Sequence, residues 1–302
     1  MTTHPVFYNL FSDDRILHAV ATAFGGDTGT LDSRRFPDGE SYLNVVDNVK
    51  DKHVIILCAL DHPNDKFLPL WFLANTLREL GAVKIGLLIP YLPYMRQDCR
   101  FNSGEAVTSR YFSRLISELA DWMVTIDPHL HRYAALSEIY TIPCDTLHAD
   151  VILAQWIKGL GTDTLLVGPD RESEQWVAGV AHQINSPYVV ADKKRFGDRN
   201  VSISLPDIAA YSHCTPVIID DIISSGETLI QITKILQKSN QRPIHCAAIH
   251  GIFAGDAYER LVKLGVNLAT GNSIRHPSNQ FDLTPLLIEG VARHLSFPSP
   301  LR

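Results

Sequence analysis

The sequence predicts an α/β protein of two similar domains, each a mainly parallel sheet flanked by helices. The chain of 302 residues is about twice as long as an average domain. Short apolar runs, typical of buried strands, alternate with longer stretches of helical period, as in a parallel sheet covered by helices. Two such units have similar spacing, since 31 residues separate Val54 from Ile85 and 29 separate Val217 from Cys246.

The first βαβ unit lies in the N-terminal half. Residues 54–60 are entirely apolar and predict a buried strand. Residues 67–80 carry leucines and aromatic residues at helical spacing, Gly81 ends that helix, and residues 83–89 predict the next strand. Apolar neighbours place the aromatic side chains of this region in the core, namely Trp71, Phe72, Tyr91 and Tyr94.

The second βαβ unit repeats this design in the C-terminal half. Residues 217–219 predict a strand that leads into a loop. Residues 228–238 have the helical period, and residues 244–249 predict the following strand. The two halves therefore look like copies of one architecture.

We place the domain boundary near residues 145–150, which divides the chain into domains 1–147 and 148–302. Residues 151–160 then form a helix, and residues 164–167 form the first strand of the second domain. We expect the last residues of the chain to pack back on the N-terminal domain.

Composition excludes several classes of protein. The formal charge of −6 provides no basic field for duplex nucleic acid, so we expect no nucleic-acid partner. No apolar run approaches the roughly 18 residues that a membrane span needs, so we expect no membrane segment. The N-terminus has no secretion signal, and the five scattered cysteines suggest neither a zinc site nor a disulfide framework. These features predict a cytoplasmic protein.

The segment 217–228 carries the most informative chemistry. Asp220 and Asp221 follow an apolar strand, and the small polar loop after them opens a helix. The carboxyl ends of parallel strands are ligand sites, and exposed N–H groups at a helix start bind anions. We therefore expect phosphate at residues 224–228, and a sugar diol on the two carboxylates, which can accept hydrogen bonds from its hydroxyls. The alternative is a solvated turn in which Ser224 or Ser225 merely caps the helix.

A second segment, 192–200, is polar and basic and lies between predicted strands at residues 188–191 and 201–205. We expect a mobile loop whose Lys193 and Arg195 can close over an anionic substrate. The alternative is a basic hairpin that only faces solvent.

Together with further motifs, these segments make the sequence resemble the ribose-phosphate pyrophosphokinases (phosphoribosyl pyrophosphate synthetases) over nearly its whole length. The Asp220 loop also resembles the type I phosphoribosyl binding loop of phosphoribosyltransferases. The motifs that carry the resemblance are Phe36-Pro37-Asp38-Gly39-Glu40, Arg96-Gln97-Asp98, Asp127-Pro128-His129, Gly168-Pro169-Asp170, Asp192-Lys193-Lys194-Arg195, the Asp220 loop and His250-Gly251-Ile252-Phe253.

The resemblance implies two type I phosphoribosyltransferase-like domains that transfer the diphosphoryl group of ATP to the C1 hydroxyl of ribose 5-phosphate, with Mg²⁺ as cofactor. It implies a homo-oligomer built from dimers, up to a hexamer. It implies that Lys193 and Arg195 serve catalysis and that His129 and Asp170 are associated with the metal. The residues implied for ATP are Phe36, Asp38 and Glu40, which reach a neighbouring subunit's site, together with Arg96, Gln97 and Asp98. The residues implied for ribose 5-phosphate are Asp220, Asp221, Ser224, Ser225, Gly226 and Thr228.

The physical chemistry of these residue types is consistent with that reaction. Phosphoryl transfer depends on charge neutralisation, so cations and a metal must converge on the triphosphate. Because Mg²⁺ prefers oxygen, chemistry alone favours Asp127 or Asp170 as ligands, and the assignment of His129 depends on the resemblance. The spacing of His131 gives no reason to prefer it.

The sequence departs from the family pattern at two places. Glu227 stands where the family has a glycine, and it brings a carboxylate close to the expected phosphate site unless its side chain points outward. After Asp170 the usual paired glycines are replaced by Arg171-Glu172-Ser173-Glu174.

Three other functions remain open. A phosphoribosyltransferase shares the Asp220 loop but needs neither two such lobes nor Lys193 and Arg195. A regulatory paralogue would bind nucleotide or phosphoribosyl ligand without turnover. A phosphoribosyl-sensing repressor would need a basic nucleic-acid-binding module, which the sequence does not contain.

Overall fold

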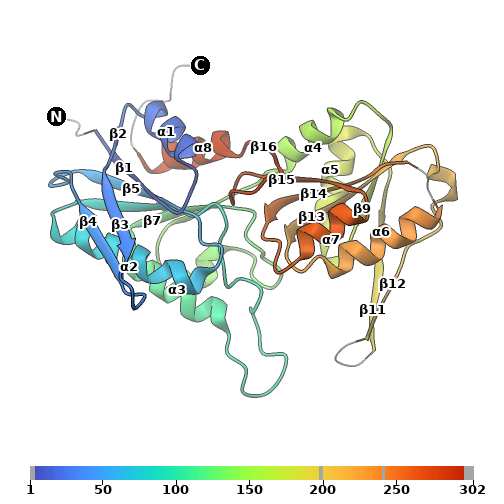
Figure 1. Ribbon diagram of the computed structural model, residues 1–302, viewed down its shortest axis with the longest axis horizontal. Coiled ribbons are helices and arrows are strands. Elements are labelled where there is room, and N and C mark those ends of the chain that lie inside the picture. The colour runs from blue at the N-terminus through green and yellow to red at the C-terminus, as the bar shows by residue number, and fades with distance from the viewer. Residues whose placement is uncertain (1–3, 197–199, 240–241, 296–302) are drawn as a thin grey trace. The chain divides into compact units, whose positions relative to one another are not determined.

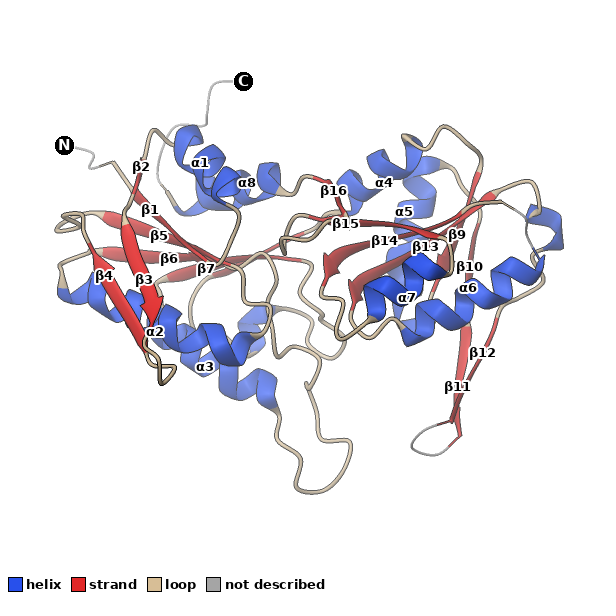
Figure 2. Cartoon of the chain, in the orientation of Figure 1, coloured by secondary structure: helices blue, strands red, loops and turns tan. Residues whose placement is uncertain are grey.

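The computed structural model describes residues 4–196, 200–239 and 242–295. For residues 194–196 and 200–202 it describes the backbone and not the side chains. Its internal contacts divide the chain into unit 1, formed by Met1–His148 and Thr284–Arg302, and unit 2, formed by Ala149–Leu283. Each unit contains a six-stranded parallel sheet with helices on both faces (Figure 1, Figure 2). The predicted α/β fold class is therefore confirmed.

In unit 1 the strand order is β2-β1-β5-β6-β7-β8. These strands are β1 (Val6–Leu10), β2 (Asp27–Thr28), β5 (His53–Cys58), β6 (Lys84–Leu88), β7 (Trp122–Ile126) and β8 (Cys144–Leu147). The helices are α1 (Asp14–Ala23), α2 (Pro63–Glu79), α3 (Thr108–Leu119), the 3₁₀ turn η1 (Leu136–Glu138) and α8 (Thr284–His294). Helices α2 and α3 cover one face, and α1 and α8 cover the other (Figure 1).

Alternation along the strands explains why both faces are covered. Val54 and Ile56 belong to the core under α2 and α3, whereas Ile55 and Leu57 point the other way and are also completely buried. On that second face α8 packs closely, because a Cβ on Gly290 would lie 2.5 Å from Val124.

In unit 2 the strand order is β10-β9-β13-β14-β15-β16. These strands are β9 (Thr164–Gly168), β10 (Tyr188–Val190), β13 (Thr215–Ile223), β14 (Ile244–Gly251), β15 (Val266–Gly271) and β16 (Asn279–Phe281). The helices are α4 (Asp150–Lys158), α5 (Glu174–Ile184), α6 (Glu227–Ser239) and α7 (Ala257–Lys263), with 3₁₀ turns η2 (Arg171–Ser173) and η3 (Ala209–Tyr211). Buried residues of α6 and α7 pack on one face of the sheet.

Two antiparallel hairpins lie outside the sheets. The first joins β3 (Leu31–Arg35) and β4 (Ser41–Val45), and β4 packs against α2. The second joins β11 (Asp192–Phe196) and β12 (Asn200–Ser204) and projects away from the sheet of unit 2 (Figure 2). The predicted loop is wrong for residues 192–196 and for residue 200, because the basic segment pairs with a strand that carries β-branched Val201 and Ile203. The part of the prediction that falls on residues 197–199 lies outside the described residues.

Strand β13 also differs from the prediction. It continues through Asp220 and Asp221 to Ile223, whereas the sequence predicted a strand that ends at Ile219. Pairing with β14 keeps the polar residues in the ladder, since Asp220 lies opposite Ala248 and Ile222 lies opposite His250. Across the described parts of the chain, none of the helices has the length and apolar character needed to cross a bilayer.

Candidate active site

The carboxyl ends of four neighbouring strands in unit 2 lie at one edge of its sheet. Strands β10, β9, β13 and β14 are adjacent and parallel, so the segments that follow them meet there. Asp170 follows β9, and Lys193 follows β10 at the start of the β11–β12 hairpin. The loop 224–226 follows β13 and leads into α6.

Asp220 and Asp221 form an acidic pair at this edge. The backbone N–H of Asp221 donates to Oδ1 of Asp220 over 3.0 Å. Burial raises the pKa of Asp220 well above its ordinary value, and the carboxylates of Asp221 and Asp170 raise it further. The fold thus holds three acidic side chains within electrostatic reach of one another. Their repulsion and burial destabilise the fold, and a bound hydroxyl donor or cation would offset this destabilisation.

The loop after β13 presents a helix N-terminus. Gly226 has a φ of +70°, which a side chain would strain, and its carbonyl accepts the N–H of Ile230 in α6. The N–H of Ala254 donates to the carbonyl of Ser224 over 3.1 Å and fixes the start of the loop. The exposed Ser225 and the half-buried Thr228 add hydroxyl groups. A helix start with small polar residues is suited to an anion.

Glu227 does not turn its charge onto this loop. Its Oε1 accepts a 2.5 Å hydrogen bond from Nη1 of Arg260 on α7, and this bond lowers the pKa of Glu227 below its ordinary value. Helix α7 also packs beneath the loop, because a Cβ on Gly226 would lie 3.3 Å from Leu261. The outward orientation required by the sequence analysis is thus present.

Lys193 extends from the β11–β12 hairpin toward two other segments at this edge of the sheet, the start of α6 and the turn after β9. Its Nζ lies 3.3 Å from Oγ1 of Thr228 and 3.9 Å from Oδ2 of Asp170. The backbone of Arg195 pairs with Val201 in the hairpin, and its side chain lies outside the described part of the structure.

The segment after Asp170 caps itself without glycines. The carboxylate of Asp170 accepts the N–H of Ser173, and the hydroxyl of Ser173 donates to the Asp170 carbonyl over 2.6 Å. Arg171 reaches Asp192 at 3.6 Å, so this turn contacts the base of the β11–β12 hairpin.

In unit 1 the predicted nucleotide residues follow β6. Arg96 is exposed, Gln97 is half-buried, and Asp98 is only 8% exposed. Nε of Arg132 lies 3.3 Å from Oδ1 of Asp98, and the hydroxyl of Tyr133 donates to the Asp98 carbonyl. Asp98 therefore contacts Arg132, a residue that the sequence motifs did not include.

The predicted metal residue of unit 1 follows the neighbouring strand β7. Asp127 has a φ of +37° and accepts a 2.9 Å hydrogen bond from Nδ1 of His148. Nδ1 of His129 lies 3.0 Å from Nε2 of His131. The structure thus pairs His129 with His131, which the sequence gave no reason to prefer.

Phe36, Asp38 and Glu40 occupy the tip of the β3–β4 hairpin. The N–H of Phe36 donates to the Glu40 carbonyl, and Gly39 has a φ of +95° in this turn. Phe36 is 39% exposed and contacts Tyr42 edge to face. Such a tip presents a ring and two carboxylates to solvent or to another molecule.

The described contacts bring together the predicted residues of unit 2, except for the Arg195 side chain. In unit 1 the predicted residues follow the adjacent strands β6 and β7. Sequence reasoning missed Arg132, His131 and Arg260. For Arg260 the sequence indicated only that a carboxylate at position 227 needs a counter-ion, and not which residue supplies it.

Comparison with known proteins agrees with this arrangement. Residues 7–119 match the model of the N-terminal domain of ribose phosphate pyrophosphokinase, and residues 136–267 match the phosphoribosyl transferase domain. The ribose-phosphate pyrophosphokinase of Saccharolobus solfataricus is 31% identical over 278 residues, covering 88% of this chain and 91% of the relative. That of Sulfurisphaera tokodaii is 32% identical over 251 residues, covering 81% and 84%.

The chain belongs to the ribose-phosphate pyrophosphokinase family. Among solved structures, the phosphoribosylpyrophosphate synthetase of Mycobacterium smegmatis shares the fold, with a TM-score of 0.83 at 21% identity. The match covers 97% of this chain and 99% of that one. Membership in the ribose-phosphate pyrophosphokinase family therefore extends over both units.

Proposed function

We propose that this chain transfers the diphosphoryl group of ATP to the C1 hydroxyl of ribose 5-phosphate. The C1 oxygen attacks the β-phosphorus, the bond to the α-phosphate oxygen breaks, and AMP leaves while the hydroxyl proton is released. The products are 5-phosphoribosyl 1-pyrophosphate and AMP. The observation that carries the proposal is the acidic pair Asp220–Asp221 joined directly to an anion-binding helix start.

Ribose 5-phosphate fits that combination. Asp220 and Asp221 accept hydrogen bonds from the vicinal hydroxyls of the ribose. Carboxylate oxygens can accept these bonds, whereas cationic side chains cannot. Ser224, Ser225, Gly226 and Thr228 hold the 5-phosphate at the N-terminus of α6, where backbone N–H groups and the helix dipole favour negative charge.

Lys193 and Arg195 serve catalysis in this proposal. Lys193 already lies between Thr228 and Asp170, so its charge is close to both the phosphate loop and the acidic cluster. A cation held there stabilises the negative charge that spreads over the transferred group in the transition state.

ATP is assigned to the N-terminal domain, residues 1–147, and ribose 5-phosphate to the C-terminal domain, residues 148–302. Arg96, Gln97 and Asp98 contact the nucleotide within one subunit. Phe36, Asp38 and Glu40 reach the ATP of a neighbouring subunit from their hairpin tip, so the active form is a homo-oligomer built from dimers, up to a hexamer.

Mg²⁺ is the proposed cofactor, with Asp170 and His129 as its associated residues. The acidic cluster of unit 2 fits the ion, because carboxylate oxygens are the ligands that Mg²⁺ prefers and these carboxylates repel one another without a cation. When bound, Mg²⁺ neutralises triphosphate charge. His129 offers nitrogen, which suits Mg²⁺ less well.

A cytoplasmic location is proposed on the same basis. In the described part of the chain none of the five cysteines forms a disulfide, as is usual in a reducing compartment, and both substrates are charged metabolites.

The test is AMP release by the purified protein with ATP, Mg²⁺ and ribose 5-phosphate. AMP must appear only when ribose 5-phosphate is present, and Asp221→Asn must require more of the sugar for the same rate. Binding of both ligands without AMP release would indicate the regulatory paralogue instead. Release of pyrophosphate from phosphoribosyl pyrophosphate with a free base would indicate a phosphoribosyltransferase.

A further inference from the structure

The loop between β14 and α7 lies beside the phosphate loop, the segment proposed to hold the 5-phosphate. The N–H groups of Ile252 and Phe253 both donate to the carbonyl of Ile223, over 2.9 and 3.0 Å. The N–H of Ala254 donates to the carbonyl of Ser224, the first residue of the phosphate loop. Three successive backbone donors of one loop thus hold the carbonyls at the start of the other.

These hydrogen bonds fix the direction of two N–H groups in the phosphate loop. In a trans peptide bond the carbonyl and the following N–H point in opposite directions, and the described part of the chain contains no cis peptide bond. Because the preceding carbonyls are turned toward the β14 side, the N–H groups of Ser224 and Ser225 point toward the β9 side of β13. Asp170 and Lys193 follow β9 and β10 on that side, so a phosphate placed there would meet both N–H groups.

Phe253 adopts a backbone conformation that is unfavourable for its residue type. Its φ is +48°, in the left-handed region where the Cβ of an L-residue is crowded by the backbone. This conformation sets the relative direction of the N–H groups of Phe253 and Ala254, which lie on either side of it in the chain. The Phe253 ring is only 8% exposed and lies over Gly251, where an added Cβ would be 2.7 Å from the ring. Packing of this ring must therefore offset the unfavourable backbone.

Two further rings hold Phe253 in place, and we call the three residues Phe253, Tyr258 and His276 the Phe253 cluster. The Phe253 ring stacks on the imidazole of His276, with centroids 4.4 Å apart, and meets the ring of Tyr258 edge to face at 5.3 Å. Tyr258 also contacts His276 edge to face at 4.7 Å, so each ring contacts the other two. The N–H of Ser278 donates to Nδ1 of His276, which anchors the imidazole to the segment between β15 and β16.

We propose that the Phe253 cluster positions the phosphate loop for the 5-phosphate of the sugar. Packing of the rings keeps the backbone of Phe253 left-handed, and this backbone aims the N–H groups of Ser224 and Ser225 at the phosphate. Phe253, Tyr258 and His276 are then positioning residues, because they act through the backbone of the loop. When the cluster is weakened, a smaller fraction of molecules has a competent loop, and the apparent affinity for the sugar falls by that fraction. The inference rests on the proposed function, since it requires ribose 5-phosphate at this loop.

Titration calorimetry with ribose 5-phosphate tests the proposal. Mg²⁺ and α,β-methylene-ATP are present, and no transfer occurs because a carbon replaces the bridging oxygen that the reaction would release. Phe253→Ala removes the ring but retains the unfavourable backbone, so it should weaken sugar binding roughly 10-fold. Phe253→Gly also lacks the ring, but glycine adopts positive φ about as readily as negative φ, so binding should stay within about 3-fold of wild type. If the ring had only a general structural role, both variants would weaken binding equally.

Two variants of Tyr258 test the cluster from α7 and separate the ring from its hydroxyl group. Tyr258→Ala removes both edge-to-face contacts and should weaken ribose 5-phosphate binding roughly 5-fold. Tyr258→Phe keeps the ring and should bind the sugar like wild type. Equal weakening in the two variants would assign the effect to the hydroxyl group and contradict the proposed role of the rings.

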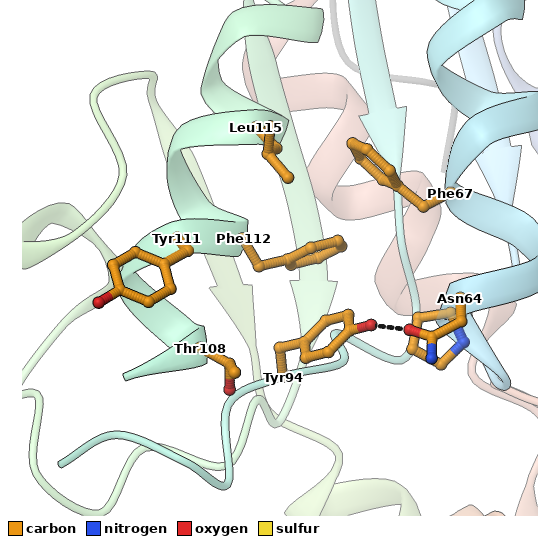
Figure 3. A pocket seen from close by; sticks show the side chains of 8 residues that line it. Asn64, Phe67, Tyr94, Thr108, Tyr111, Phe112 and Leu115 are labelled. Atoms are coloured by element: carbon orange, nitrogen blue, oxygen red, sulfur yellow. Dashed lines mark hydrogen bonds between the residues drawn. The ribbon is translucent and has the colours of Figure 1, made fainter. Parts of the chain in front are cut away.

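An aromatic cluster of unit 1 supplies a matched control. Phe112 on α3 is 5% exposed and packs against Phe67 and Tyr94, with ring centroids 5.4 and 4.7 Å away, where the three rings line a pocket of about 340 Å³ (Figure 3). Phe112→Ala should lower the melting temperature through the loss of a buried ring but leave the affinity for ribose 5-phosphate unchanged. Trp71 and Phe72 of α2 cannot serve as such controls, because each is 39% exposed. The expectation that these two residues belong to the core is therefore wrong.

The possible results separate this inference from the proposed function. Wild-type affinity in Phe253→Ala, or equal weakening in Phe253→Ala and Phe253→Gly, would overturn the inference alone. A wild-type protein that binds no ribose 5-phosphate would overturn both, whereas sugar binding without AMP release from ATP would overturn only the proposed function. Far-UV circular dichroism verifies that each variant is folded, and the Tyr258 pair decides the question if Phe253→Ala is not.

Discussion

At the scale of single residues, the site contains a buried carboxylate whose charge lowers the stability of the fold. Asp220 has a raised pKa because it is buried beside Asp221 and near Asp170. Unfavourable charge of this kind is typical of functional sites, where stability is lost in exchange for ligand affinity. We therefore expect that replacing Asp220 by a neutral residue raises the stability of the fold and lowers the affinity for ribose 5-phosphate.

Asp220→Asn should raise the melting temperature at pH 7 and weaken ribose 5-phosphate binding. The amide keeps an acceptor for the Asp221 N–H but removes the disfavoured charge. Since a raised carboxyl pKa lowers stability wherever the unfolded carboxyl is ionised, the gain should shrink as pH falls below the raised pKa and vanish below the ordinary carboxyl pKa of about 4. Each ~1 kcal/mol gained corresponds to about 2–4 °C.

Calorimetry across pH and the KM for ribose 5-phosphate measure these effects. KM should increase roughly 10-fold or more, as for a lost hydrogen bond to a charged group. The exposed Asp32→Asn serves as the control. A variant less stable than wild type at pH 7 would contradict the assigned cost.

Lys193→Ala should reduce kcat about 100- to 1,000-fold with little change in KM for ribose 5-phosphate. Its charge is needed where negative charge develops, and removal of one such donor typically costs this much. Steady-state kinetics separates the two parameters. Equal losses in kcat and in sugar affinity would assign Lys193 to ground-state binding.

At the scale of elements, α7 holds the phosphate loop from outside the site. Arg260 engages Glu227, and Leu261 packs beneath Gly226. Both partners of the ion pair are exposed, so the pair itself contributes little to folding stability. Its importance lies in keeping a carboxylate away from the N-terminus of α6.

Arg260→Ala should therefore raise the KM for ribose 5-phosphate roughly 5-fold, as expected for ~1 kcal/mol of charge interaction at a helix N-terminus. The double variant Arg260→Ala, Glu227→Gln should restore the wild-type KM, because the freed carboxylate is then absent. Melting temperatures should be nearly equal in all three proteins. If the double variant stays as weak as the single one, Arg260 acts through packing and not through Glu227.

The sequence analysis captured the elements because apolar runs and helical period depend on local pattern. It failed where the pairing of strands decides: β13 continues through Asp220 and Asp221 because β14 lies beside it, and residues 192–196 pair with residues 200–204. Asp170 and Lys193 could be nominated from motifs. Arg260 and Arg132 could not, because their partners Glu227 and Asp98 are distant in the chain.

At the scale of the whole molecule, the proposed residues for ATP and for ribose 5-phosphate belong to separate units of the chain. Two of the proposed ATP residues, Phe36 and Glu40, lie at the tip of a hairpin in unit 1. If that tip serves a neighbouring subunit, then activity is a property of the assembly.

Mixing two inactive variants should restore activity in that case. One variant carries Phe36→Ala with Glu40→Ala, and the other carries Lys193→Ala with Arg195→Ala. Mixed oligomers contain sites in which both sets are intact, so AMP release should reappear at a fraction of the wild-type rate. If the subunits demonstrably exchange and no activity returns, each hairpin serves its own chain.

The reaction itself is tested most directly by ³¹P NMR of the products formed from ATP, ribose 5-phosphate and Mg²⁺. Transfer of the diphosphoryl group predicts equal amounts of AMP and of a sugar that carries two mutually coupled phosphorus resonances besides its 5-phosphate. The appearance of ADP with a singly phosphorylated C1, or of AMP and free pyrophosphate without any change in the sugar, would contradict the account.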